Sequence, residues 1–375
     1  MVLTPLFKLM AEKQASDMFF TAGSPIQIKI QGEVMPINAQ VLDPAAVQKL
    51  AYECMTPEQI KIFEAELEIN FSLIESGVGS FRVNAFRQRG AVAMVIRHIK
   101  VAIPSIEELR LPPVLKDVVM EKRGLIMVVG STGSGKSSTL AAMINHRNQS
   151  KSGHILTIED PIEFMYRHAK SIVNQREVGI DTRSYSNALV NAMREAPDVI
   201  LIGECRDRET FQAALAYAQT GHLCLTTVHA NNSYYALNRV INFFPHDARN
   251  SLLMDLAVSL RAIVSQRLVR DLQGKLCPAA EILMNTKHIQ ELIKSSEIDQ
   301  IKDAMEQSLA PGSQTFEQSL YGLYTQGVIA LDEALAHADS ATNLSWLIDN
   351  AKGTSPESSR KTAQADDLSS IRLNI

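Results

Sequence analysis

The chain has 375 residues, 46% of them hydrophobic, which is ordinary for a globular protein. This length exceeds one typical hydrophobic core, so we expect two domains. Lys and Arg number 37 against 41 Asp and Glu, a formal net charge of −4. A nucleic-acid motor usually carries a basic excess, so no nucleic-acid partner is expected.

The chain start and the cysteines indicate a cytoplasmic protein. Residues 1–10 lack the basic front end and long apolar core of a signal peptide. No apolar run reaches the ~20 residues that cross a bilayer, so we expect membrane contact only through partners. The cysteines form no CxxC pair, which argues against a zinc site or disulfides and favours buried thiols. They are Cys54, Cys205, Cys224 and Cys277.

Residues 1–100 are expected to form a small α+β domain. Strict alternation of apolar and polar residues over 26–31 predicts a half-exposed strand. Further strands are expected over residues 70–74, 79–88 and 91–99. Helices are expected over residues 5–15, 45–55 and 57–66. The prolines within residues 101–113 indicate a linker.

From residue 114 onward, helices alternate with short buried strands. The expected strands are residues 125–129, 155–158, 199–202 and 223–227. Helices are expected over residues 186–194, 209–218 and 250–262, and over most of the chain after Glu281. This alternation implies an α/β fold with a mostly parallel sheet. Residues 114–345 are expected to form this second domain. Residues 346–375 are expected to form a disordered tail, because Gly353 to Ile375 are rich in polar residues and include few apolar ones.

Residues 130–137 fit the pattern G-x-x-x-x-G-K-[ST] of a phosphate-binding loop. An apolar strand precedes them and a good helix start follows, which is the context that the motif requires. The glycines let backbone N–H groups face one anion, and the helix start favours phosphate. Lys136 is expected at the β and γ phosphates and Ser137 at Mg²⁺, whereas the choice between ATP and GTP stays open. The loop residues expected to bind the nucleotide are Gly130, Ser131, Thr132, Gly133, Ser134, Gly135, Lys136, Ser137 and Ser138.

Polar groups follow three of the expected strands, where an open α/β sheet builds its site. The first group holds three carboxylates in five residues, namely Glu159, Asp160 and Glu163. The second resembles a Walker B strand, with Gly203 where the metal-binding Asp usually stands. Glu204 is therefore expected to serve the metal directly or through water. The third group contains His229; a lone histidine is more often structural, but its place at a strand end favours a functional role.

Four arginines are candidates for stabilising phosphate charge, which guanidinium groups do in phosphoryl transfer. Arg194 precedes the strand 199–202 and Arg206 follows it. Arg82 and Arg97 lie on expected strands of the first domain. For these two, a solvated sheet face is an equally good interpretation.

These segments occur together in one family. The glycine loop, the acidic box at 158–163, the strand end Gly-Glu-Cys-Arg-Asp at 203–207 and the Thr-Val-His-Ala box at 227–230 resemble those of type II/IV secretion ATPases. The segments Phe-Arg-Val-Asn-Ala-Phe and Leu-Arg-Leu-Pro-Pro in the first 113 residues are similar to the PilT/PilU family of type IV pilus retraction ATPases. Details such as Arg-Glu-Ala-Pro-Asp at 194–198 resemble the PilU branch.

The resemblance covers about residues 1–345 and implies a RecA-like P-loop ATPase domain, a smaller N-terminal α+β domain that is PAS-like, and a helical C-terminal region. It implies a homohexamer with ATP between the domains. By this likeness Glu163 polarises the attacking water, Glu204 and Ser137 serve Mg²⁺, and His229 senses the γ-phosphate. The arginines that would stabilise phosphate charge are Arg82, Arg97, Arg194 and Arg206, with Glu159 and Asp160 in support.

The resemblance also implies partners and a location. It implies an ATP-hydrolysing motor for pilus retraction at the cytoplasmic side of the inner-membrane pilus base, with a PilT-like ATPase and an inner-membrane platform protein as partners. Residues 287–294 keep the apolar spacing of the matching PilT helix but not its arginines. PilU-like proteins are generally thought to assist PilT, so an accessory role is expected.

Three alternatives stay open. A pilus-assembly or secretion ATPase usually carries a four-cysteine zinc module, which this sequence lacks. A nucleic-acid motor on the same core is disfavoured by the charge balance. An adaptor that binds ATP without hydrolysing it is disfavoured by the retained Lys136, Glu163 and Glu204.

Overall fold

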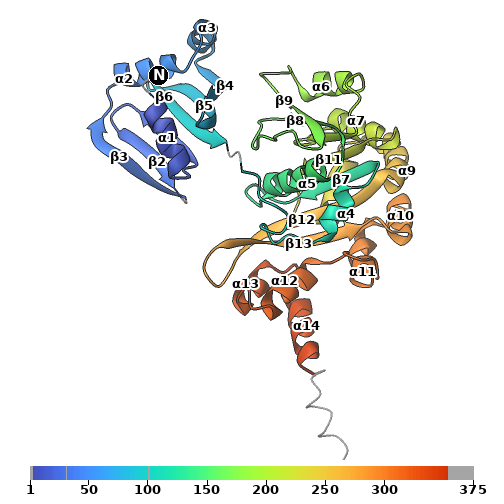
Figure 1. Ribbon diagram of the computed structural model, residues 1–375. Helices are drawn as coiled ribbons and strands as arrows, with labels where there is room; N and C mark the ends of the chain where they lie inside the picture. Colours follow the sequence, from blue (N-terminus) through green and yellow to red (C-terminus); the bar gives the residue numbers. More distant parts are fainter. Residues whose placement is uncertain (1–2, 31, 100–101, 354–375) are drawn as a thin grey trace, which may run out of the picture. The chain divides into compact units, whose positions relative to one another are not determined.

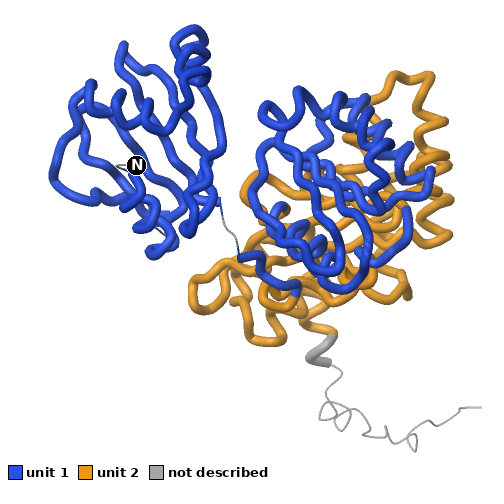
Figure 2. Tube along the Cα trace, turned by 45° about the horizontal axis from the view of Figure 1, so that its top comes forward, with its two compact units in different colours: residues 1–106, 119–123, 137–226 blue, residues 107–118, 124–136, 227–375 orange. Residues whose placement is uncertain are grey.

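The computed structural model describes residues 3–30, 32–99 and 102–353 of the chain. These residues contain two β-sheets, one from the first hundred residues and one from residues after 123 (Figure 1). Figure 2 colours two compact units into which the chain divides. The first unit is Met1–Ile106, Val119–Arg123 and Ser137–Thr226, and the second is Glu107–Val118, Gly124–Lys136 and Thr227–Ile375.

The first hundred residues form the α+β domain that the sequence predicts. Its elements are α1 (Thr4–Glu12), β1 (Asp17–Thr21), β2 (Pro25–Ile30), β3 (Glu33–Val41), α2 (Pro44–Glu53), α3 (Pro57–Glu66), β4 (Glu68–Glu75), β5 (Gly79–Gln88) and β6 (Ala91–Ile99). The six strands lie in the order β3-β2-β1-β6-β5-β4, and every neighbouring pair is antiparallel.

Local signals explain the helices of this domain. Asp43 caps α2 by accepting the Ala46 backbone N–H at 2.7 Å. Thr56 and Gln59 form a capping box at the start of α3. Phe7 of α1 stacks on Phe81 of β5 with ring centroids 4.4 Å apart, and both side chains are fully buried. Aromatic burial of this kind holds the helix on one face of the sheet.

The remaining described residues form the second sheet and its helices. The elements are α4 (Val114–Val119), β7 (Gly124–Val129), α5 (Lys136–Ser150), β8 (Gly153–Glu159), β9 (Ser171–Glu177), α6 (Tyr185–Ala192), β10 (Val199–Ile202), α7 (Arg208–Gln219), β11 (Leu223–Val228), α8 (Ser233–Asn242), η1 (His246–Ala248), α9 (Arg249–Ser259), β12 (Leu260–Arg270), β13 (Leu276–Met284), α10 (Lys287–Lys294), η2 (Ile298–Gln300), α11 (Ile301–Glu306), α12 (Phe316–Thr325), α13 (Leu331–His337) and α14 (Ala341–Gly353).

The second sheet has seven strands in the order β13-β12-β7-β11-β10-β8-β9. In the first unit, β8 pairs in parallel with both β9 and β10, and β10 with β11. In the second unit, β12 pairs in parallel with β7 and antiparallel with β13. The sheet is therefore mostly parallel, as the alternation of elements predicts, with one antiparallel edge strand.

The sequence patterns did not predict several of the strands. Strand β3 is exposed along nearly its whole length and contains Pro36, so it carries no alternation of burial and suits only a sheet edge. The helix expected over residues 250–262 was too long, because α9 ends at Ser259 and β12 begins at Leu260. Strand β12 is buried on both faces for most of its length, and such a run does not reveal its period. The helical region expected after Glu281 begins only at Lys287, after β13.

The expected tail boundary at residue 346 was also wrong. Helix α14 runs from Ala341 to Gly353, and its Leu344 and Ile348 are buried in an apolar cluster with residues of β12, β13, α12 and α13. The expected linker, 101–113, contains no helix or strand in its described part, residues 102–113. Residues 354–375, the rest of the expected tail, lie outside the described residues.

Two expectations from composition can be compared with the structure. All four cysteines are buried and none forms a disulfide, which confirms the prediction of buried thiols. Within the described ranges, no helix has both the length and the apolar character needed to cross a bilayer.

Candidate nucleotide-binding site

The glycine loop connects the buried strand β7 to helix α5, as the sequence predicts. Strand β7 ends at Val129, and α5 begins at Lys136. The backbone φ angles of Gly130, Gly133 and Gly135 are +156°, +79° and +87°. These values lie in the region that favours glycine, so the three glycines give the loop its path.

Gly130 is also required by close packing. A Cβ at Gly130 would lie 2.3 Å from Ser134 Oγ and 2.6 Å from the backbone oxygen of Gln266. A Cβ at Gly135 would lie 2.8 Å from Gln266 Nε2, which ends a side chain that can move away, whereas a Cβ at Gly133 would meet nothing within 4 Å. Strand β12, which carries Gln266, therefore packs closely against the loop.

Alanine substitutions of two loop glycines should distinguish the cost of a steric clash from the cost of backbone strain. Gly130→Ala should unfold at a markedly lower temperature, losing about 2 kcal/mol or more, because backbone strain adds to a steric clash. Gly133→Ala should lose only about 1 kcal/mol, the cost of a left-handed residue without a clash. Thermal unfolding of both variants tests this, and equal losses would contradict the packing.

The loop offers groups that suit a phosphate. Lys136 Nζ donates to the backbone oxygens of Gly130 at 2.9 Å and Ser131 at 2.7 Å, and lies 3.4 Å from His229 Nδ1. Ser134 Oγ is buried and has no hydrogen-bond partner within the described residues. An unpaired buried hydroxyl costs free energy, and a phosphate oxygen would satisfy it. A cation, an unpaired hydroxyl and a helix start together fit a bound nucleotide.

His229 and Asn231 line a cavity of about 500 Å³ in the second unit, together with residues of α8. This cavity includes Arg239, a cation that the sequence motifs did not single out. Only its place on the helix that follows the His229 box could have indicated it. His229 thus lies beside Lys136 and also lines a cavity that includes a further cation.

The acidic box begins in the last two residues of β8, in the first unit. Glu159 accepts from Thr157 Oγ1 at 2.6 Å and from Gln175 Nε2 at 3.3 Å, and the backbone N–H of Glu163 also donates to it. Burial raises the pKa of Glu159 to about 7, against these hydrogen bonds. The Glu159 carboxyl is therefore neutral below pH 7 and charged above it. The side chain of Glu163 is exposed and so open to water.

Glu204 follows β10 and meets one of the predicted arginines. Arg206 Nη2 lies 2.7 Å from Glu204 Oε2, and this hydrogen bond raises the pKa of the guanidinium group. Glu204 is mostly shielded, whereas Arg206 remains exposed. A metal ion bound by Glu204 would therefore share this carboxylate with Arg206.

The other arginines occupy different positions. Arg82 and Arg97 are directly opposite each other on β5 and β6, so they lie on one face of the sheet. Asp17, on the neighbouring strand β1, lies 2.8 Å from Arg97 Nε and offsets part of this charge. Arg194 is exposed and bonds weakly to Asn191 at 3.4 Å. The predicted phosphate roles of these arginines stay predictions.

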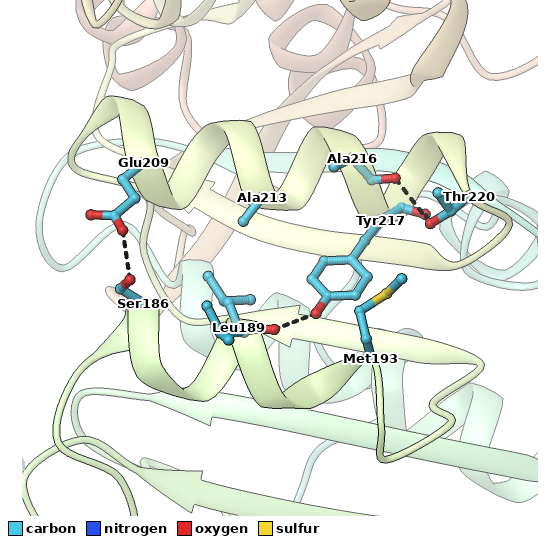
Figure 3. A pocket seen from close by; sticks show the side chains of 9 residues that line it. Ser186, Leu189, Met193, Glu209, Ala213, Ala216, Tyr217 and Thr220 are labelled. Atoms are coloured by element: carbon cyan, nitrogen blue, oxygen red, sulfur yellow. Dashed lines mark hydrogen bonds between the residues drawn. The ribbon is translucent and has the colours of Figure 1, made fainter.

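A cavity of about 290 Å³ between α6 and α7 is of a different kind (Figure 3). Leu189, Met193 and Tyr217 give it an apolar wall, and Ser186 Oγ donates to Glu209 at 2.6 Å on its rim. None of its lining residues is a cation. This cavity therefore does not suit a triphosphate.

Comparison with known proteins identifies the family. The family model described as type II/IV secretion system protein matches residues 1–336. The type IV pilus ATPase PilU of Pseudomonas aeruginosa is 49% identical over 344 residues, which are 92% of this chain and 90% of PilU. The chain belongs to the PilT/PilU branch of the type II/IV secretion ATPases. This confirms the family that the motifs predict.

A second sequence relative and a solved structure also support the assignment of this chain to the PilT/PilU branch. The type IV pilus retraction ATPase PilT of Pseudomonas aeruginosa is 41% identical over 343 residues, 92% of this chain and all of PilT. A crystal structure of the pilus retraction motor PilT with bound ADP has a TM-score of 0.85 at 40% identity and covers 91% of this chain and 98% of that one. The PilT/PilU fold, with its N-terminal sheet domain and helical C-terminal region, is therefore shared along almost the whole chain.

Proposed function

We propose that this protein is an ATPase that drives or assists the retraction of type IV pili. The observation that carries the proposal is the loop itself, in which Lys136 lies beside His229 and Ser134 keeps an unpaired buried hydroxyl. The family membership supports it, because the relatives are named as pilus ATPases and one PilT structure holds ADP.

The residues take the following roles in this proposal. Lys136 and the loop N–H groups bind the phosphates, and His229 senses the γ-phosphate. Glu163, whose side chain is exposed, orients and polarises the attacking water. When bound, Mg²⁺ would supply charge that offsets the phosphate oxygens. Ser137 and Glu204 would hold it, since both offer the oxygen ligands that it prefers.

The arginines and the assembly complete the proposal. Arg82, Arg97, Arg194 and Arg206 stabilise phosphate charge, the first two from the N-terminal domain. The protein acts as a homohexamer at the cytoplasmic face of the inner-membrane pilus base. There it contacts the platform protein and depends on a PilT-like motor. Residues 287–294 support this dependence, because they lack the arginines of the matching PilT helix.

A genetic experiment tests the proposal. Pilus retraction is measured in strains that lack either this protein or the PilT-like motor. Loss of this protein should weaken retraction under load, and the wild-type gene should restore it while Lys136→Ala should not. Overexpression of this protein should fail to restore retraction in the strain without the PilT-like motor.

Each part of the proposal can fail separately. Full restoration by Lys136→Ala would show that the protein acts as an adaptor without hydrolysis. Retraction without the PilT-like motor would show an independent motor and overturn the accessory role. Unchanged retraction in the strain that lacks this protein would remove it from retraction altogether.

A further inference from the structure

Arg267 lies where several segments of the second unit meet. Its Nη2 group donates to the backbone oxygen of Asn231 at 3.4 Å, and its Nη1 group donates to the backbone oxygen of His337 at 2.6 Å. The same side chain forms an ion pair with Asp339. Asn231 is two residues after His229 and lines the same cavity, so Arg267 contacts the segment that carries the proposed phosphate sensor.

The other contacts of Arg267 belong to the C-terminal helices. His337 is the last residue of α13, so the guanidinium group binds the carbonyl end of that helix, where a cation is favourable. The guanidinium carbon lies 3.9 Å from the ring centroid of Phe316, a fully buried residue of α12. Only a planar group with several donors can make these contacts at once.

A second contact joins the same two regions. Asp339 accepts from Asn232 Nδ2 at 3.1 Å, and Asn232 in turn caps α8 by accepting the N–H of Tyr235 at 3.0 Å. The start of α8 is also fixed from β13, because Glu281 accepts the N–H of Ser233 at 2.7 Å. The chain that follows His229 is therefore bonded to the C-terminal region by two contacts, Arg267 with Asn231 and Asp339 with Asn232.

We propose that Arg267 is a positioning residue that holds residues 229–231 against α12 and α13 through Asn231, His337 and Asp339, and so couples the phosphate sensor to the C-terminal helices. This inference rests on the proposed function of His229. Its consequence is that the C-terminal helices and the γ-phosphate affect each other: holding the helices favours the sensing position of His229, and a bound γ-phosphate favours the docked helices.

The test compares arginines on the same strand of the full-length protein. Arg267→Gln removes the guanidinium group, Arg267→Lys keeps only its charge, and Asp339→Asn removes the charge of its partner while keeping the side-chain size. Arg270→Gln is the matched control, because Arg270 is exposed on β12 and its side chain donates to Gly274, in the turn after the strand, rather than to residues 229–231. The measurements are kcat and KM for ATP hydrolysis and the affinities for ADP and for ATPγS.

Arg267→Gln and Arg267→Lys should both lower kcat and ATPγS affinity by about tenfold, a typical coupling between sites. Their affinity for ADP, which lacks the γ-phosphate, should stay at the wild-type value. Asp339→Asn should show the same pattern to a smaller extent, and Arg270→Gln should match the wild type. If Arg267→Gln does not fold, Asp339→Asn decides the matter.

Two results would overturn the inference. One is wild-type kcat and ATPγS affinity in Arg267→Gln and Asp339→Asn. The other is an equal loss of ADP and ATPγS affinity, which would show that Arg267 only stabilises the fold. A wild-type protein without turnover would instead count against the proposed function, and the comparison of ADP with ATPγS would still test Arg267.

Discussion

ATP hydrolysis should be abolished in Lys136→Ala. The ammonium group of Lys136 is buried within the loop, where two backbone oxygens hold it. Its position beside His229 Nδ1 puts this charge among the groups that we propose to meet the γ-phosphate. Contacts with a charged group are worth about 1.5–3 kcal/mol, so ATP binding should weaken roughly ten- to a hundredfold as well. Phosphate release by purified protein and titration with a fluorescent ATP analogue measure the two effects.

The control for Lys136→Ala is Lys275→Ala. Lys275 is an exposed lysine in the turn between β12 and β13, so its loss should change neither quantity. Circular dichroism would show whether Lys136→Ala keeps its fold, because the two loop oxygens lose their donor. Turnover in Lys136→Ala equal to that of Lys275→Ala would remove the glycine loop from catalysis.

Glu163→Gln should bind ATP normally but hydrolyse it about 10²–10⁴-fold more slowly, the usual contribution of a general base. The substitution keeps the size of the side chain and the backbone N–H that donates to Glu159, so the acidic box should keep its shape. A loss confined to kcat, with unchanged ATP affinity, is the expected signature. Single-turnover measurements separate the chemical step from product release.

Glu159→Gln is the matched control, because Glu159 lies in the same acidic box and its pKa of about 7 also suits a base. Glu159 is partly exposed but accepts hydrogen bonds from Thr157 and Gln175, so we expect it to shape the box rather than to activate the attacking water. Glu159→Gln should therefore retain turnover within about tenfold of the wild type, well short of the loss of a general base. If instead Glu159→Gln abolishes hydrolysis and Glu163→Gln does not, the base is Glu159. A midpoint near pH 7 in the kcat profile of the wild type, lost in Glu159→Gln, would support that reversal.

Much of the second domain could be predicted because its signals are local. The glycine loop, its strand and its helix are contiguous, and β10 spans the four residues that its apolar run predicts. The acidic box begins at the end of β8, where a parallel sheet builds its site. The pairing of Glu204 with Arg206 could also have been predicted from the sequence, because only one residue separates them.

What the sequence did not reveal depends on long-range contacts. Strand β3 exists because it pairs with the edge of β2, although its own residues carry no alternation. Arg267 meets Asn231 and Asp339 from 36 and 72 positions away, and no pattern in the sequence links the three. The raised pKa of Glu159 results from burial, to which Gln175, 16 positions away, contributes a contact.

The pairing of β12 with β7 limits how this part of the chain can evolve. Ser265 is opposite Val129, and the next two residues have different partners: Gln266 borders the loop glycines, whereas Arg267 faces the C-terminal helices. Side chains alternate along a strand, so a one-residue insertion or deletion before Gln266 would exchange these two partners. We therefore expect functional descendants of this chain to tolerate insertions and deletions in the turn after Arg270. Within residues 262–267 we expect none.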